Sequence, residues 1–155
     1  MGFLRLITGM GMNDSLLPLI IPSIASPSVF YFMYSYLQSS LPLSLVEAAR
    51  IDGSKEFRTF NQIVLPIMKP AMAVQAIFTF VGSWNNYFVP ALVIQSKEKM
   101  TVPILIALLR GADYMNRDMG KIYMMIMVAI VPIVLVYLIL SKYIIAGVTL
   151  GGVKG

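Results

Sequence analysis

The chain has 155 residues, of which 58% are hydrophobic and 12% are charged, and its formal net charge is +5. Soluble domains carry about 25% charged residues, so this composition indicates a membrane protein. The sequence contains neither cysteine nor histidine, which excludes disulfides, thiol nucleophiles, Cys/His metal sites and imidazole acid–base chemistry. We attribute the positive charge to basic residues that flank membrane spans, rather than to nucleic-acid binding.

Three stretches lack charged side chains over a length that can cross a bilayer, which takes about 20 residues. They cover residues 16–37, 70–96 and 122–141. Backbone groups in hydrocarbon must be hydrogen-bonded within their own segment, so we expect helices. The predicted fold is therefore all-α and polytopic, with about three transmembrane helices. Three prolines predict kinks in the first span, at Pro18, Pro22 and Pro27.

The remaining segments are predicted to lie outside the spans. Residues 102–109 are apolar but too short to cross, so we expect a short interfacial helix, capped by Thr101 and ended by Gly111. Residues 112–120 predict a polar loop, and the glycine-rich tail 147–155 predicts irregular structure.

Residues 44–65 carry charged side chains between two predicted spans, where crossing a bilayer does not require them. Ser44 and Glu47 have the spacing of a capping box, which predicts a helix from there to about Asp52. Glu47 is also one turn from Arg50, so the two side chains can form an ion pair.

The first helix of this segment presents small side chains on one face. Leu45, Ala48 and Ala49 fall at i, i+3 and i+4, and the two alanines leave room for another surface to approach closely. Gly53 can adopt the positive φ that ends the helix.

A second helix is predicted over residues 55–65, with Ser54 as its cap and Pro66 stopping or kinking it. Its apolar face is expected to consist of Phe57, Phe60 and Val64. The two helices predict a helix-turn-helix at the membrane surface.

Seven residues of this segment match a known signature. The pattern is Glu-Ala-Ala, three residues, Gly, nine residues, Ile, one residue and Leu-Pro. It is filled by Glu47, Ala48, Ala49, Gly53, Ile63, Leu65 and Pro66. In this the chain resembles the permeases of ATP-binding-cassette (ABC) importers. Residues 82–86 and 147–155 look like the carbohydrate-uptake branch, which is related to the maltose system, and the similarity runs over nearly the whole chain.

The resemblance implies a membrane-spanning permease subunit of an ATP-driven sugar importer. Its implied partners are ABC ATPase subunits, a second permease subunit, an extracytoplasmic solute-binding protein, the sugar and membrane lipid, with no nucleic acid. It places residues 38–69 and the C-terminus in the cytoplasm of a bacterial-type cell, with 44–65 as the coupling segment. Basic residues alone do not decide this orientation, because each side holds six. Such permeases have about six spans, so residues 1–155 are expected to be a C-terminal portion of the transmembrane domain.

The second predicted span carries a polar seam. On an ideal helix Gln75, Thr79, Gly82 and Asn86 fall on one side, with Ser83 close by. Such side chains either join packed membrane helices or line a substrate path, and both interpretations stay open.

Two further residues of this span are candidates for contact with a sugar. Sugars stack on aromatic rings and bind amides, so Trp84 and Asn85 are included, although Trp84 lies opposite the seam and near mid-span. We expect Asn86 to be the strongest candidate for contact with solute.

The sequence predicts neither catalysis nor ion coupling in this chain. No ionisable residue lies in the core of a predicted span, which argues against an ion-coupled carrier. No P-loop pattern is present, so ATP is expected to bind a separate subunit, and no cofactor or metal is expected here. Two alternatives stay open: a permease for a different solute, and a truncated, non-transporting fragment that still binds the ATPase.

Overall fold

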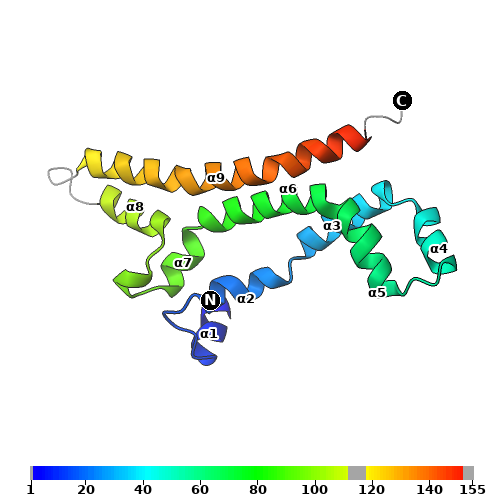
Figure 1. Cartoon of the computed structure of the whole chain (residues 1–155). Helices are drawn as coiled ribbons and strands as arrows, with labels where there is room; N and C mark the ends of the chain where they lie inside the picture. Colours follow the sequence, from blue (N-terminus) through cyan, green and yellow to red (C-terminus); the bar gives the residue numbers. More distant parts are fainter. Residues whose placement is uncertain (1, 112–117, 152–155) are drawn as a thin grey trace. The chain divides into compact units, whose positions relative to one another are not determined.

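The structure is a computed structural model that describes residues 2–111 and 118–151 (Figure 1). Throughout this described part the regular secondary structure is helical, without strands. The elements in chain order are α1 (Gly2–Gly9), α2 (Leu17–Ile24), α3 (Pro27–Ser40), α4 (Leu43–Ile51), α5 (Glu56–Thr59), η1 (Phe60–Val64), α6 (Leu65–Trp84), α7 (Phe88–Val93), η2 (Lys97–Lys99), α8 (Val102–Gly111) and α9 (Met119–Gly151).

Three helical stretches are long and apolar enough to cross a membrane, namely Leu17–Ser40, Glu56–Trp84 and Met119–Ile144. The prediction of an all-α, polytopic membrane protein with three spans is thereby confirmed. The most apolar part of each stretch is largely exposed: only 6%, 17% and 6% of it, respectively, is buried inside the chain. Their apolar surface is therefore left mostly to lipid or to other polypeptides.

The first span is interrupted between α2 and α3. Ala25 leaves helical geometry, with φ −111° and ψ 80°. The next residue, Ser26, precedes Pro27, and the proline ring disfavours the helical conformation of the residue before it. The chain thus restarts as α3 at Pro27, where a missing N–H costs no helical hydrogen bond. The predicted kink is a complete break at this point, whereas Pro22 lies inside α2.

The second span differs from its predicted boundaries of 70–96. The helix begins before Pro70 and includes charged residues there. Its backbone hydrogen bonds do not depend on side-chain charge, so the helix continues where its side chains reach water. It ends at Trp84, since the chain turns at Asn85 and Asn86 before α7. Placing Trp84 near mid-span was therefore wrong, and an end position suits a side chain that prefers interfaces. The helical alignment of Asn86 with Gln75 was also wrong, because Asn86 lies beyond the helix.

The third span is longer than predicted. Helix α9 begins at Met119, and Asp118 caps it by accepting a hydrogen bond from the backbone N–H of Lys121 at 3.0 Å. The helix continues to Gly151, so the prediction of irregular structure from residue 147 was wrong up to that point, and 152–155 lie outside the described residues. Glycine weakens a helix by about 1 kcal/mol per residue but does not by itself end it.

The region before α9 agrees only in part with the prediction. Of the predicted loop 112–120, residues 112–117 lie outside the described part of the chain, and Met119 and Gly120 already belong to α9. The short helix is present as α8, which is too short to be a span. Thr101 does not cap it: its hydroxyl oxygen is buried and has no hydrogen-bond partner among residues 2–111 and 118–151. The backbone carbonyl of Thr101 instead accepts the first bond of the helix, from Leu105 at 3.1 Å.

The chain divides into two compact units. The first consists of Met1–Ser26 and Phe80–Leu135, and the second of Pro27–Thr79 and Val136–Gly155. The core of the first unit is small and contains Ile7, Val93, Ile94, Ile104 and Ile122. Among the side chains of the second unit that the structure describes, the buried ones are Thr59, Met68, Ala71 and Ala73. Such small cores are expected of a chain whose spans expose their apolar surface.

Candidate functional site

Helix α4 ends in a turn that depends on Gly53. Gly53 has φ +74°, a conformation that side chains with a Cβ rarely adopt, and its N–H donates to the carbonyl of Arg50 at 3.0 Å. The next N–H, that of Ser54, donates to the carbonyl of Ala49 at 2.9 Å. These two bonds are the pair that defines a Schellman motif. The predicted helix end at Gly53 is therefore confirmed, and the turn satisfies carbonyls that the helix leaves unpaired.

The helix starts differ from the predicted caps. Pro42 occupies the N-cap position of α4, and no side chain there makes a capping hydrogen bond, so the predicted capping box of Ser44 and Glu47 does not form. Lys55 rather than Ser54 precedes α5, again without a side-chain cap. A proline in the extended conformation, φ −67° and ψ 120°, directs the chain into α4 without a hydroxyl cap.

The segment from α5 to α6 is one continuous helical path. Residues Phe60–Val64 form a π-helical turn, and Pro66 is the second residue of α6, which follows it. A proline clashes with the carbonyl four residues earlier in a regular helix, and a wider π turn relieves that clash. The prediction was that Pro66 either stops or kinks the second helix. The helix does not stop there, because the widened turn just before Pro66 carries it past the proline.

Two polar contacts connect the halves of the turn between α4 and α5. Arg50 pairs with Glu56 at 2.9 Å, and not with Glu47 as predicted. Both side chains are well exposed, so this ion pair contributes little to stability. The Thr59 hydroxyl donates to the Ser54 hydroxyl at 3.0 Å, and Thr59 is only 3% exposed. Sequence patterning did not identify Thr59, since it expected aromatic residues rather than a threonine to be buried on α5.

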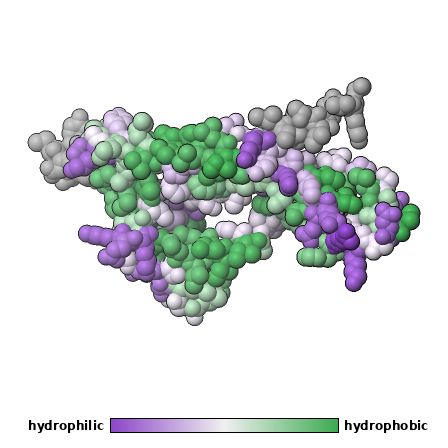
Figure 2. Space-filling model, in the orientation of Figure 1, coloured by the Kyte–Doolittle hydropathy of each residue, from purple (hydrophilic) through white to green (hydrophobic). Residues whose placement is uncertain are grey.

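Large apolar side chains are exposed around this same turn. Ile51 is 87% exposed, Phe57 81% and Leu43 73%. The predicted apolar face of the second helix, which included Phe57 and Phe60, is consequently not buried within the described residues. Figure 2 shows hydrophobic and hydrophilic residues interspersed over α4 and α5, whereas the visible face of α9 is predominantly hydrophobic. Apolar groups exposed among charged ones are typical of a protein-binding surface.

The seven residues of the signature lie on successive parts of this path. Glu47, Ala48 and Gly53 are exposed, and Ala49 is half-buried. The others are distributed over the π turn and the start of α6, where Ile63 and Leu65 are half-buried and Pro66 is exposed. The alanine face and the Gly53 turn are thus accessible to a partner, and the later positions form the base of the segment.

Gln75 lines a wide pocket of about 600 Å³ within the second unit. The other walls come from α3 and comprise Pro27, Ser28, Tyr31, Phe32 and Ser35. Hydroxyl, amide and aromatic groups therefore face the same space, which suits a polar solute with an apolar face. Thr79, one turn further along α6, is exposed. At Gly82, an added Cβ would have no neighbour within 4 Å, so the surface there is open.

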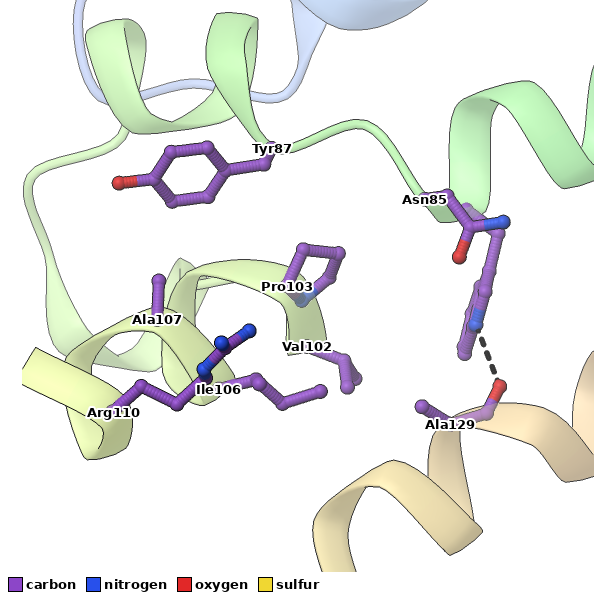
Figure 3. Close-up of a pocket in the computed structure, with 9 residues that line it drawn as sticks. Asn85, Tyr87, Val102, Pro103, Ile106, Ala107, Arg110 and Ala129 are labelled. Carbon is purple, nitrogen blue, oxygen red and sulfur yellow. Dashed lines mark hydrogen bonds between the residues drawn. The ribbon is translucent and has the colours of Figure 1, made fainter. Parts of the chain in front are cut away.

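Trp84 and Asn85 line a second pocket, of about 240 Å³, within the first unit (Figure 3). The indole N–H of Trp84 donates to the carbonyl of Ala129 in α9 at 3.0 Å, and its ring stacks on Phe80 with centroids 5.6 Å apart. These two contacts hold the ring in one orientation at the end of α6. The remaining walls are Tyr87, Val102, Pro103, Ile106, Ala107 and Arg110.

The polar groups of this pocket come from different elements. Figure 3 shows the guanidinium of Arg110 extending from α8 toward the interior, with Tyr87 and Asn85 on other sides. Tyr87 and Arg110 were not singled out by the sequence, because their shared pocket depends on the packing of α8 against the end of α6. Ser83 lines an adjacent pocket of about 220 Å³, together with Trp84 and the buried, unpartnered hydroxyl of Thr101.

Asn86 has a local structural role. Its Oδ1 accepts a hydrogen bond from the backbone N–H of Val89 at 3.4 Å, in the first turn of α7. It does not line any of the pockets described above. Asn86 stays a proposed substrate contact, but its amide already supports the start of α7.

A cluster around Asp14 was not identified by the sequence. Its carboxylate accepts hydrogen bonds from the backbone N–H groups of Gln95 and Ser96, at 2.8 and 2.9 Å, and from the Ser96 hydroxyl. Lys99 pairs with it at 3.0 Å, and the backbone N–H of Asp14 donates to Val93 at 3.1 Å. Asp14 also has a positive φ of 51°, which aspartate tolerates better than most residues. We call these contacts the Asp14 clamp.

The clamp stabilises the ionised form of its carboxyl group. Bonds from the Ser96 hydroxyl, then from the N–H groups of Ser96 and Gln95, hold the pKa of Asp14 well below its ordinary value of 3.8. Asp118 shows a shift in the same direction, because the backbone N–H and ammonium group of Lys121 lower the pKa of that carboxyl. Both groups therefore stay charged at neutral pH.

Residues 5–149 match the family described as binding-protein-dependent transport system inner membrane component. Among curated proteins, the chain is 38% identical over 154 residues to the arabinooligosaccharides transport system permease protein AraQ of Bacillus subtilis, covering 97% of this chain and 53% of that protein.

Two further relatives show the same pattern. The diacetylchitobiose uptake system permease protein NgcG of Streptomyces coelicolor is 35% identical, with 82% of this chain and 42% of that protein covered. The trehalose/maltose transport system permease protein MalG of Thermococcus litoralis is 33% identical, with 83% and 46% covered. The chain therefore spans about half the length of the curated relatives it matches.

Proposed function

Because the chain belongs to the family of binding-protein-dependent transport system inner membrane components, we propose that it forms part of the permease of an ATP-driven sugar importer. In this proposal residues 44–65 couple the membrane spans to a separate ATPase. The observation that carries it is the exposed apolar surface of Leu43, Ile51 and Phe57 around the Gly53 turn. The turn that presents this surface is held by backbone hydrogen bonds of ordinary length and lies outside the apolar part of the span. Such a surface suits docking of a folded partner.

The proposed partners follow from the family description and the signature. A binding protein is part of the family's description, and we add ATPase subunits and a second permease subunit. With docking on the ATPase, residues 38–69 face the cytoplasm, which places the Asp14 clamp and the loops around η2 on the extracytoplasmic side. ATP hydrolysis occurs on the ATPase in this scheme, and the chain itself transmits motion through the helix that continues from α5 into α6.

A sugar is the proposed solute class. The relatives named above are permease proteins of an arabinooligosaccharides transport system, a diacetylchitobiose uptake system and a trehalose/maltose transport system. In this chain the pocket beside Trp84 combines an aromatic ring, the amide of Asn85, a phenol and a guanidinium. Carbohydrate rings present C–H faces to aromatic groups and hydroxyls to amides and charged donors, so this set suits a sugar. Gln75, Thr79 and Ser83 are proposed as further polar contacts along the path.

Replacing Trp84 tests the proposed sugar pocket. We expect Trp84→Ala to reduce sugar uptake several-fold, since it removes the ring, while Trp84→Phe keeps a ring and loses only a hydrogen bond worth about 1 kcal/mol. Uptake of labelled sugar into proteoliposomes that contain the assembled transporter is the measurement. Phe78→Ala is the matched control, because Phe78 lies on the same helix and is 65% exposed. Uptake by Trp84→Ala at the control's rate would remove Trp84 from the substrate path.

Reconstitution tests the function as a whole. The chain, the ATPase, the second permease subunit and the solute-binding protein of the same organism are combined in vesicles, and ATP hydrolysis is measured with oligosaccharides and with amino acids. We expect stimulation by at least one oligosaccharide and by no amino acid. Stimulation by amino acids alone would instead support a permease for a different solute. Stable ATPase binding without any transport would support the non-transporting fragment.

A further inference from the structure

A groove of about 330 Å³ lies within the second unit, separate from the pockets of the proposed sugar path. One wall is a face of α6 and the other comes from the second half of α9. Figure 1 shows these two helices running side by side. The lining residues are Lys69, Met72, Ala73, Ala76, Leu140 and Tyr143.

The groove results from small side chains placed at helical spacing. Residues 69, 72, 73 and 76 follow the i, i+3, i+4, i+7 pattern, so they share one face of α6. Ala73 and Ala76 leave space where larger residues would fill it, and Met72 and Tyr143 are about 40% exposed beside it. The face extends about 10 Å along the helix from Lys69, at 1.5 Å per residue. The interior is apolar over this length.

Two ammonium groups border one end of the groove. Lys69 is the single charged residue of α6 and lies in its second turn. Lys142 places its ammonium 5.1 Å from the centroid of the Tyr143 ring, which is itself part of the groove wall. Neither lysine forms an ion pair with another residue of 2–111 or 118–151, and neither α6 nor the described side chains of α9 include a carboxylate.

From this arrangement we propose that the groove binds one anionic phospholipid. Its phosphate group lies between Lys69 and Lys142, and part of one acyl chain follows Met72, Ala73 and Ala76 along α6. Basic residues at the end of an apolar cleft between membrane helices have the charge and polarity pattern that such a lipid requires. The acyl chain of a zwitterionic lipid also fits the apolar part of the groove, but its headgroup has no net charge to attract the two lysines. The site therefore selects for headgroups with a net negative charge.

Quenching by brominated lipids measures this selectivity. Trp84 is the only tryptophan of the chain, so Trp84→Phe combined with Tyr143→Trp places a single fluorophore in the groove wall. The reporter chain is placed in vesicles of brominated phosphatidylglycerol mixed with unbrominated phosphatidylcholine, and in the reverse mixture. We expect an apparent preference for phosphatidylglycerol of up to about thirtyfold, from two surface lysines.

The decisive comparison removes equal charge at two places. Lys69→Gln with Lys142→Gln is expected to abolish the preference, whereas Lys97→Gln with Lys121→Gln, which removes two lysines elsewhere, leaves it intact. Ala76→Phe is expected to reduce quenching by filling the groove while both lysines remain. Equal quenching by the two lipids in the reporter chain, or equal loss in both lysine pairs, would overturn the proposal. Circular dichroism of every variant checks that helicity is preserved.

Discussion

Replacing Gly53 with proline is expected to abolish co-purification of the ATPase while the chain still inserts into the membrane. The proline ring fixes φ near −65° and has no N–H, whereas Gly53 has φ +74° and donates to Arg50. The Schellman turn is then lost, and with it the angle between α4 and α5. Because the apolar spans are unchanged, insertion is retained. The measurement is the amount of ATPase retained on the affinity-tagged chain, relative to chain recovered from membranes.

Two controls make this result specific. Gly53→Asn introduces a side chain that tolerates positive φ better than others, so we expect most binding to survive. Gly82→Ala changes a glycine at an open position of α6 and should bind the ATPase normally. If Gly53→Pro retains the ATPase as well as Gly82→Ala does, residues 44–65 are not the docking segment.

Removal of the Asp14 carboxylate is expected to loosen the first unit. In Asp14→Asn the amide presents N–H groups where the carboxylate accepted bonds, so the Ser96 hydroxyl and Lys99 lose their charged partner. The chain has no native cysteine, so Ile7→Cys supplies a single reporter at a position only 4% exposed. We expect its maleimide labelling to become several-fold faster when Asp14→Asn is added.

The second aspartate of the described part of the first unit is the control. Asp118 pairs with Lys121 at 3.2 Å, near in sequence and largely exposed, so Asp118→Asn should leave the labelling rate of Ile7→Cys unchanged. Equal acceleration by both substitutions would indicate a general charge effect rather than a clamp. No acceleration by Asp14→Asn would show that the buried position of Ile7 does not depend on these bonds.

The lowered pKa of Asp14 sets the pH range of this effect. A carboxyl group whose pKa is depressed in the folded protein contributes fully above its unfolded pKa, about 3.9, and loses its contribution as pH falls through the folded value. The folded value lies below that of the free side chain, because Ser96, Gln95 and Lys99 favour the charged form. The effect of Asp14→Asn on the labelling rate of Ile7→Cys should therefore stay constant from neutral pH down to about pH 5.

The presence of helices and of membrane spans could be predicted directly from the sequence. The three apolar stretches have the length that a bilayer requires, and each overlaps a helical stretch of the structure that is long enough to span a membrane. The end of α4 was equally predictable, since Gly53 is the residue that a left-handed turn favours. These features depend on the chemistry of neighbouring residues, and local sequence therefore contains the information.

The ends of the helices were less predictable, because they were inferred from the positions of charged side chains. Charge indicates where a helix leaves hydrocarbon, but backbone hydrogen bonds continue past that point, as α6 does upstream of Lys69. At the other end of this span the helix stops at Trp84, although the following residues are uncharged. The predicted substrate seam was extended to Asn86 for that reason, whereas the structure assigns this amide to the start of α7.

By itself, the sequence determined the membrane class, the helical content and the signature over Glu47–Pro66, because these depend on composition and on short, regular spacings. Only the tertiary structure decided which distant groups meet. It brings Asp14 to Ser96, 82 residues away, and Trp84 to Ala129, 45 residues away. It also pairs Arg50 with Glu56 across a turn, in place of its helical neighbour Glu47. Such contacts depend on how helices pack and where turns direct the chain, and residue spacing along one helix does not contain that information.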